Sequence, residues 1–304
     1  MRSRNCITSK LVSTQRRKDA KTQRISFCLL FATLLLCVFA LNLPVSGQRV
    51  AIITPDKAES SKAFTGSLVE RSSLRVLDPD LSESAFRSVS ISNPFNLTRD
   101  EAKLIGAAIG CDYFLVTRSA TQRRSSFQRK EYYESFAAIH VFSSRSGRMV
   151  LWRLPRFEAA KPEAAAKALD IAIQSIATEV DAAILKANKT EIDEPPLPAL
   201  EEPPDPASPL AKGFRAPIPF RRIKPEYTEI AALFDVTTTV EITVDLDAAG
   251  TILRTEITRS AGYGLDEAVE KAVRTMNWLS ASRDGKPLAM RFLLRYNFKK
   301  ADKN

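Results

Sequence analysis

Apolar and polar residues alternate along much of the C-terminal part of the chain, with the period of two that is typical of half-buried β-strands. Two such stretches, residues 240–246 and 253–257, follow one another closely and predict a β-hairpin. Residues 265–276 then carry apolar side chains at intervals of three or four, which predicts an amphipathic helix, and alternation returns in residues 288–298. The pattern therefore predicts a small domain with the order ββαβ.

Residues 48–190 predict a larger domain in which strands and helices alternate along the chain. Runs rich in β-branched and aromatic residues predict strands at residues 48–54, 74–77, 112–118, 133–143 and 148–154. A helix predicted between Thr98 and Gly110 has a capping residue at its start and a glycine at its end. Further on, apolar residues recur every three or four positions and predict a long core-facing helix: Leu169, Ile173, Ile176, Val180 and Ile184. These elements predict an α/β domain of two or three layers, and an α+β class for the whole chain.

An uncharged apolar segment, residues 25–47, separates a basic head, residues 1–24, from the predicted α/β domain. Its length is close to the roughly 20 residues that a transmembrane helix needs, which predicts a single membrane anchor. The small residues Val45, Ser46 and Gly47 also fit a cleavage site, so a cleaved signal segment remains an alternative. The basic head is expected in the cytoplasm in both cases, and everything after Gly47 on the other side of the membrane.

Residues 191–219 predict a linker between the α/β domain and the C-terminal domain, residues 220–304. The stretch from Glu191 to Pro209 holds seven prolines and six acidic residues, and it contains no lysine or arginine. Proline fixes φ and like charges repel one another, so we expect this segment to be extended rather than packed into a core. It is interpreted either as a spacer with some reach or as a flexible joint.

The positive charge of the chain lies mostly in the head. Residues 1–24 contain eight lysines or arginines and one aspartate, which is +7 of the formal net charge of +10. The rest of the chain lacks the clustered basic charge that neutralises phosphates. No nucleic-acid partner is therefore expected.

No set of residues suited to catalysis is evident in the sequence. His140 is the one histidine, and the four cysteines, Cys6, Cys28, Cys37 and Cys111, leave a single thiol after the apolar segment. These numbers exclude a histidine-pair metal site and a disulfide within either predicted domain. P-loop, GxSxG, HExxH and CxxC patterns are also absent. We therefore expect a protein that is not an enzyme, with no catalytic residue, no metal site and no cofactor.

Four segments of the C-terminal domain resemble the TonB C-terminal domain family. They read, in order, KPEYTEIAALF, VEITVDLDAAGTI, ITRSAGYGLDEAVEKAV and GKPLAMRFLLRYNF. The most specific features are the turn that ends in Gly250, the segment Ser260–Asp266 and the aromatic Trp278. The chain departs from the family in having Thr228 after Tyr227, where proline is common, and Ser280 at another frequent proline position. These changes touch local backbone shape more than the core, so the resemblance still implies the family fold.

The resemblance implies that the C-terminal domain binds a short peptide of an outer-membrane TonB-dependent receptor. Such a peptide is expected to add as a strand to the last strand of the sheet, because an edge strand has unpaired N–H and C=O groups. The partner-binding residues identified in this way are Met290, Arg291, Phe292, Leu293, Leu294, Arg295, Tyr296, Asn297 and Phe298. The family function would be energy transduction for transport, by a single-pass inner-membrane protein with its bulk in the periplasm and an ExbB/ExbD-like motor as a further partner.

A different function remains open as an alternative. The apolar segment contains Ser26 and Thr33 but no histidine, whereas TonB anchors typically carry a serine and a histidine that couple to the motor. The order of elements in residues 48–190 resembles the α/β domain shared by CsgG, the TolB N-terminal domain and LpoB-type activators, which implies an envelope-binding domain. The alternative is a periplasmic adaptor or scaffold that binds envelope partners without energy transfer.

Overall fold

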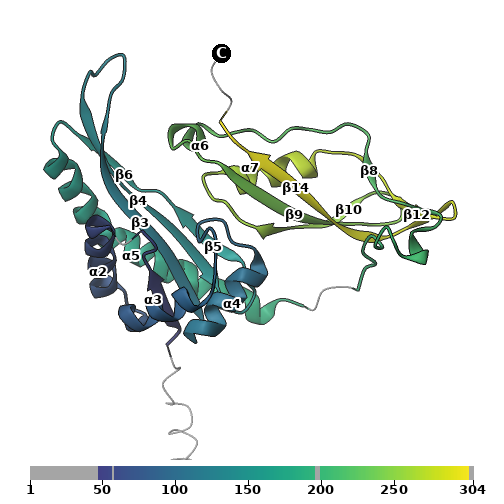
Figure 1. The fold of residues 1–304 in the computed structure, drawn as a ribbon, viewed down its shortest axis with the longest axis horizontal. Coiled ribbons are helices and arrows are strands. Elements are labelled where there is room, and N and C mark those ends of the chain that lie inside the picture. The colour runs from purple at the N-terminus through teal and green to yellow at the C-terminus, as the bar shows by residue number, and fades with distance from the viewer. Residues whose placement is uncertain (1–46, 57, 196–198, 301–304) are drawn as a thin grey trace, which may run out of the picture. The chain divides into compact units, whose positions relative to one another are not determined.

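The computed structural model describes residues 47–56, 58–195 and 199–300, and residues 48–304 belong to one compact unit (Figure 1). The basic head and all but the last residue of the predicted anchor or signal segment lie outside the described residues. Within the described ranges, no helix combines the length and the apolar character needed to cross a membrane.

A six-stranded mixed sheet organises the first domain. Its strands are β1 (Arg49–Ile53), β2 (Arg75–Val76), β3 (Tyr113–Arg124), β4 (Tyr132–Ser143), β5 (Met149–Arg153) and β6 (Arg156–Ala159). They are ordered β2-β1-β3-β4-β5, and β6 also pairs with β4. β1 is parallel to β2 and β3, while the other pairs are antiparallel.

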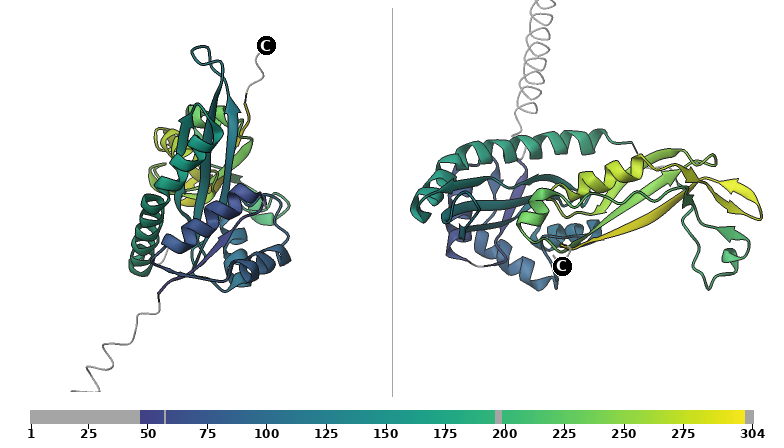
Figure 2. Two further views of the ribbon diagram at one scale, coloured as in Figure 1. Left: turned by 90° about the vertical axis from the view of Figure 1, so that its left-hand side faces the viewer. Right: turned by 90° about the horizontal axis from the view of Figure 1, so that it is seen from above.

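Helices cover both faces of this sheet, so the domain has three layers (Figures 1 and 2). The helices are α2 (Glu59–Arg71), α3 (Pro79–Ser88), α4 (Arg99–Ile109) and α5 (Pro162–Asp193). Successive residues of β1 point into different cores: Val50 packs with α2 and α5, whereas Ala51 packs with α3 and α4. The predicted apolar stripe from Leu169 to Ile184 lies on α5 and is buried against the sheet.

The predicted ends of α4 are confirmed in detail. Thr98 and Glu101 form a reciprocal capping box, and Gly110 ends the helix at φ 76°, a backbone conformation that glycine adopts without strain. Sequence patterns did not predict α3 or β6. The start of α3 is nevertheless marked by Asp78, whose side chain accepts a hydrogen bond from the Leu81 N–H, and by Pro79 in the first turn.

Two elements are longer than predicted. β3 continues past Arg118 to Arg124, because the polar residues beyond Arg118 stay paired with β4 in an unbroken register. α5 continues to Asp193, inside the segment predicted as linker from Glu191.

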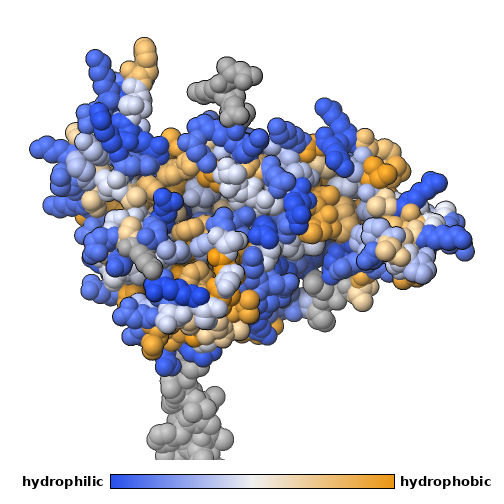
Figure 3. Space-filling model, viewed as in Figure 1, coloured by the Kyte–Doolittle hydropathy of each residue, from blue (hydrophilic) through white to orange (hydrophobic). Residues whose placement is uncertain are grey.

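Hydrophilic residues cover much of the face drawn in Figure 3, with smaller apolar areas between them.

The C-terminal domain contains the predicted ββαβ order. β9 (Thr238–Leu246) and β10 (Ile252–Arg259) form the hairpin, α7 (Leu265–Arg274) follows, and β14 (Met290–Phe298) is the last strand. The sheet order is β10-β9-β14, with antiparallel pairing throughout, and the buried side of α7 packs on one face of the sheet. A set of short elements that the alternation did not predict completes the domain: β7 (Phe214–Arg215), β8 (Ile218–Pro219), α6 (Glu229–Leu233), β11 (Trp278–Leu279), β12 (Ala281–Arg283), β13 (Lys286–Leu288) and the 3-10 turn Pro209–Ala211.

Candidate functional site at the edge of the C-terminal sheet

β14 lies at one edge of the three-stranded sheet and pairs with β9 on one side only. The predicted alternation of its side chains is confirmed. Phe292 and Phe298 are buried in the core, and Leu294 and Tyr296 are half-buried against it. The Phe292 ring meets Trp278 edge-on, with 5.1 Å between ring centroids. This packing fixes the register of β14, because a shift of one residue would move every aromatic side chain to the opposite face.

The backbone of β14 presents hydrogen-bonding groups away from β9. The Arg291 N–H points outward, since it donates to the Glu201 carbonyl at 2.8 Å. In an antiparallel pair every second residue shares this direction, so the N–H and C=O groups of Leu293, Arg295 and Asn297 also face outward. Among the described residues, these three N–H groups have no backbone partner. We call the outward-facing backbone of Arg291, Leu293, Arg295 and Asn297 the β14 edge.

The opposite edge of the sheet is in contact with the α/β domain. The Ser260 N–H, just after β10, donates to the Leu97 carbonyl at 3.1 Å, and Thr98 forms an antiparallel bridge with Arg259. The Asn96 amide donates to the carbonyls of Thr239 (2.7 Å) and Ser260 (2.9 Å). The end of β10 is therefore partly covered, which leaves the β14 edge as the more open border.

Ion pairs cover the outer face of the sheet, opposite α7. Arg291 makes two hydrogen bonds of 2.7 Å with Asp245, and Arg295 bonds Glu241 at 2.7 Å. Both carboxylates are buried, and the bond to Asp245 raises the pKa of Arg291. Both arginines are paired, but the Arg291 side chain is 20% exposed, whereas the Arg295 side chain is 62% exposed and remains accessible to a partner.

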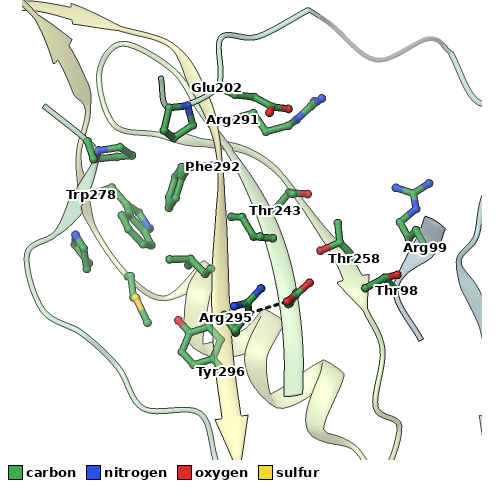
Figure 4. Close-up of a pocket in the computed structure, with 18 of the residues that line it drawn as sticks. Thr98, Arg99, Glu202, Thr243, Thr258, Trp278, Arg291, Phe292, Arg295 and Tyr296 are labelled. Carbon is green, nitrogen blue, oxygen red and sulfur yellow. Dashed lines mark hydrogen bonds and ion pairs between the residues drawn. The ribbon is translucent and has the colours of Figure 1, made fainter. Parts of the chain in front are cut away.

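A groove of about 980 Å³ runs along the β14 edge (Figure 4). We call it the edge groove. Trp278, Phe292 and Tyr296 form its apolar wall. Its polar side lies across the sheet and is lined by Thr243 of β9, Thr258 of β10 and the start of α4 at Thr98 and Arg99. An extended peptide paired with the β14 edge would present alternate side chains to the two faces of the sheet, one of which carries the apolar wall, because side chains alternate along a strand. The arrangement is suited to strand addition.

The other chemically interesting residues are buried. His140 is fully buried among aromatic rings, with Nε2 3.5 Å from the Ala261 carbonyl, and burial lowers its pKa to about 4. Cys111 is also buried, which raises the pKa of its thiol. In the part of the chain that the structure describes, no three His, Cys, Asp or Glu side chains are grouped so that they could hold a metal ion.

Two features of the site were not anticipated from the sequence. One is the contact of the linker residue Glu201 with β14, for which the sequence carries no signal. The other is the pairing of Arg291 and Arg295 with Asp245 and Glu241, which lie directly opposite them on β9. A signal for this pairing existed, because opposite charges recur at matching positions of the predicted strands.

Comparisons with known proteins identify the C-terminal domain. Residues 223–299 match the family model described as the Gram-negative bacterial TonB protein C-terminal. A search of curated proteins finds no match to the chain. Among solved structures, the solution structure of the Pseudomonas aeruginosa TonB C-terminal domain is similar, with 18% identity and a TM-score of 0.24, covering 29% of this chain and 89% of that one.

Two further solved structures are similar to a part of the chain. Lipoprotein GNA1162 from Neisseria meningitidis is 11% identical, with a TM-score of 0.30 and coverage of 43% of this chain and 99% of that one. The hypothetical protein CT253 from Chlamydia trachomatis is 12% identical, with a TM-score of 0.27 and coverage of 38% and 73%. The predicted resemblance of the C-terminal domain is confirmed by the family model: the chain carries a TonB C-terminal domain at residues 223–299.

Proposed function

We propose that this protein is a TonB-like transducer of the bacterial envelope, which couples the inner membrane to an outer-membrane transporter by β-strand addition. The observation that carries the proposal is the β14 edge, with three outward N–H groups beside a groove that has an apolar and a polar wall. The family match supports the same conclusion, because it covers the whole ββαβ unit that forms this edge.

The proposed location follows from the sequence of the first 47 residues. The apolar segment 25–47 would anchor the chain in the inner membrane, and the basic head would stay in the cytoplasm. Both folded domains would then lie in the periplasm, where the β14 edge can meet an outer-membrane receptor. An ExbB/ExbD-like motor is the proposed source of energy.

Site-specific photocrosslinking in living cells tests the partner proposal. A photoreactive residue at Leu293, which is 51% exposed at the β14 edge, should capture an outer-membrane β-barrel protein. The matched control is Leu253 in β10, which is 59% exposed on the other edge strand and should capture none. Equal capture at both positions, or capture only of cell-wall factors at Leu293, would contradict the transducer function.

A periplasmic adaptor is the second candidate, and one observation favours it. The two domains are joined by direct contacts as well as by the linker, including the Asn96 hydrogen bonds and a 2.7 Å bond from Arg148 to Glu256. Such contacts suit a scaffold that presents two binding surfaces in a fixed arrangement. They are less suited to an arm that extends under force.

The mature N-terminus distinguishes the two functions. A transducer must keep its anchor, because force from an inner-membrane motor cannot reach a released protein. Cell fractionation and N-terminal sequencing should therefore find the intact chain in the inner membrane. A soluble product that begins at Gln48 would support the adaptor instead.

A further inference from the structure

The linker contacts the β14 edge at its first outward-facing position. Glu201 forms a parallel bridge with Met290, and its carbonyl accepts the hydrogen bond from the Arg291 N–H. This is the interaction that an added strand would make with the same residue. A segment of the protein itself thus occupies one end of the site proposed for a partner.

The two acidic side chains of this segment lie beside arginines. The Glu201 carboxylate lies 3.0 Å from the Arg283 guanidinium, and Glu202 lines the edge groove beside Arg291 (Figure 4). The exposed pair with Arg283 is weak by itself, because solvent screens it. The backbone hydrogen bond and the two acidic side chains nevertheless stabilise the same contact, at the start of β14.

Proline makes the linker suited to this contact. Pro203 and Pro204 follow the two glutamates directly, so Glu202, next to the residue that pairs with the sheet, is restricted to an extended conformation. A tethered segment also has a high effective concentration, on the order of millimolar for a short flexible connection. Occupancy by the linker therefore does not require a high intrinsic affinity.

We propose that the acidic linker segment, residues 199–205, is a built-in competitor for the β14 edge, and that a partner strand gains the first position only by displacing it. This inference rests on the proposed function, because it assigns a regulation to the same edge. Leu293, Arg295 and Asn297 stay available for a first encounter. Displacement of Glu201 from Arg291 then extends the paired stretch to the full edge.

Residue-resolved amide exchange by NMR, on the full chain in detergent micelles, tests the contact. In the native chain the Arg291 amide should exchange more slowly than the Leu293 amide. The double substitution Glu201→Lys/Glu202→Lys places two cations beside Arg283 and Arg291 and should speed Arg291 exchange roughly fivefold to tenfold. The matched control, Asp170→Lys/Asp193→Lys, makes the same change of charge at exposed positions of α5, outside residues 199–205, and should leave Arg291 exchange unchanged.

A synthetic peptide with the sequence of residues 199–205 tests the competition. At millimolar concentration it should restore the slow exchange of the Arg291 amide in the Glu201→Lys/Glu202→Lys chain, while the native chain should respond several-fold less because its own linker is in place. Equal responses of the two chains, no response of the substituted chain, or fast Arg291 exchange in the native chain would overturn the proposal. The proposed function is tested separately, since capture at Leu293 does not depend on the Arg291 amide.

Discussion

The packing of β14 makes neighbouring residues of one strand differ strongly in their contribution to stability. Phe292 is 7% exposed and contacts Trp278, whereas Leu293 is 51% exposed. Replacing Phe292 by alanine removes about 150 Å² of buried apolar surface, which corresponds to about 4 kcal/mol at roughly 25 cal/mol per Å². With the cavity that the missing ring leaves, the expected loss in the free energy of unfolding is about 3–5 kcal/mol. For Leu293→Ala, the same argument gives less than about 1 kcal/mol.

Urea unfolding measures this difference. Trp278 fluorescence reports the C-terminal domain when the other tryptophan, Trp152, is replaced by phenylalanine in both variants and in the reference chain. Phe292→Ala should lower the midpoint strongly, and Leu293→Ala should leave it nearly unchanged. Similar losses for the two substitutions would refute the register of β14, and with it the assignment of the outward-facing residues of the β14 edge.

Three further predictions concern the surroundings of the site. Asp245→Ala leaves the Arg291 guanidinium without its partner in a largely buried position and should cost about 2–4 kcal/mol in urea unfolding, with part of this recovered in the Asp245→Ala/Arg291→Ala double variant. Gly262→Ala should lower thermal stability by about 1–3 kcal/mol, because Gly262 has φ 72° and the added Cβ would lie 2.3 Å from Trp152 Cδ1. An unchanged midpoint of thermal unfolding would contradict this contact. Burial lowers the His140 pKa from 6.5 to about 4, so its neutral form stabilises the fold fully above pH 6.5 and this contribution is lost as the pH falls toward 4. His140→Phe should remove that dependence, and the difference between native and variant stability should change by about 3 kcal/mol across this range; a constant difference would contradict the burial of His140.

Periodic elements were predictable because their pattern is a direct result of one-sided burial. The strands β9 and β14 and the helices α5 and α7 place most of their apolar residues on a single face, and the sequence shows this without knowledge of their neighbours. In β10 the predicted alternation that starts at Leu253 is wrong at its first residue: the register shifts between Ile252 and Arg254, so Ile252 packs against the core and Leu253 is exposed. The capping box of α4 was predictable for a similar reason, since its two partners lie three residues apart.

The features that were not predicted depend on contacts between distant residues. Glu201 meets Arg291 from a linker that has no periodicity, and Asn96 hydrogen-bonds Thr239 and Ser260 across two domains. The short strands β7, β8, β11 and β12 contain two or three residues each, so no alternation can develop within them. Their position follows from the packing around the ββαβ unit rather than from local sequence.

Amide exchange along β14, measured with and without the bound partner, tests the central claim most directly. Once photocrosslinking at Leu293 has identified the partner, exchange is measured by NMR for the chain alone and with that partner bound without a crosslink. Strand addition predicts that the Leu293, Arg295 and Asn297 amides become protected, while the Leu294 and Tyr296 amides, which face β9, keep the protection they already have. Binding without any gain of protection at these three outward amides would contradict strand addition at the β14 edge.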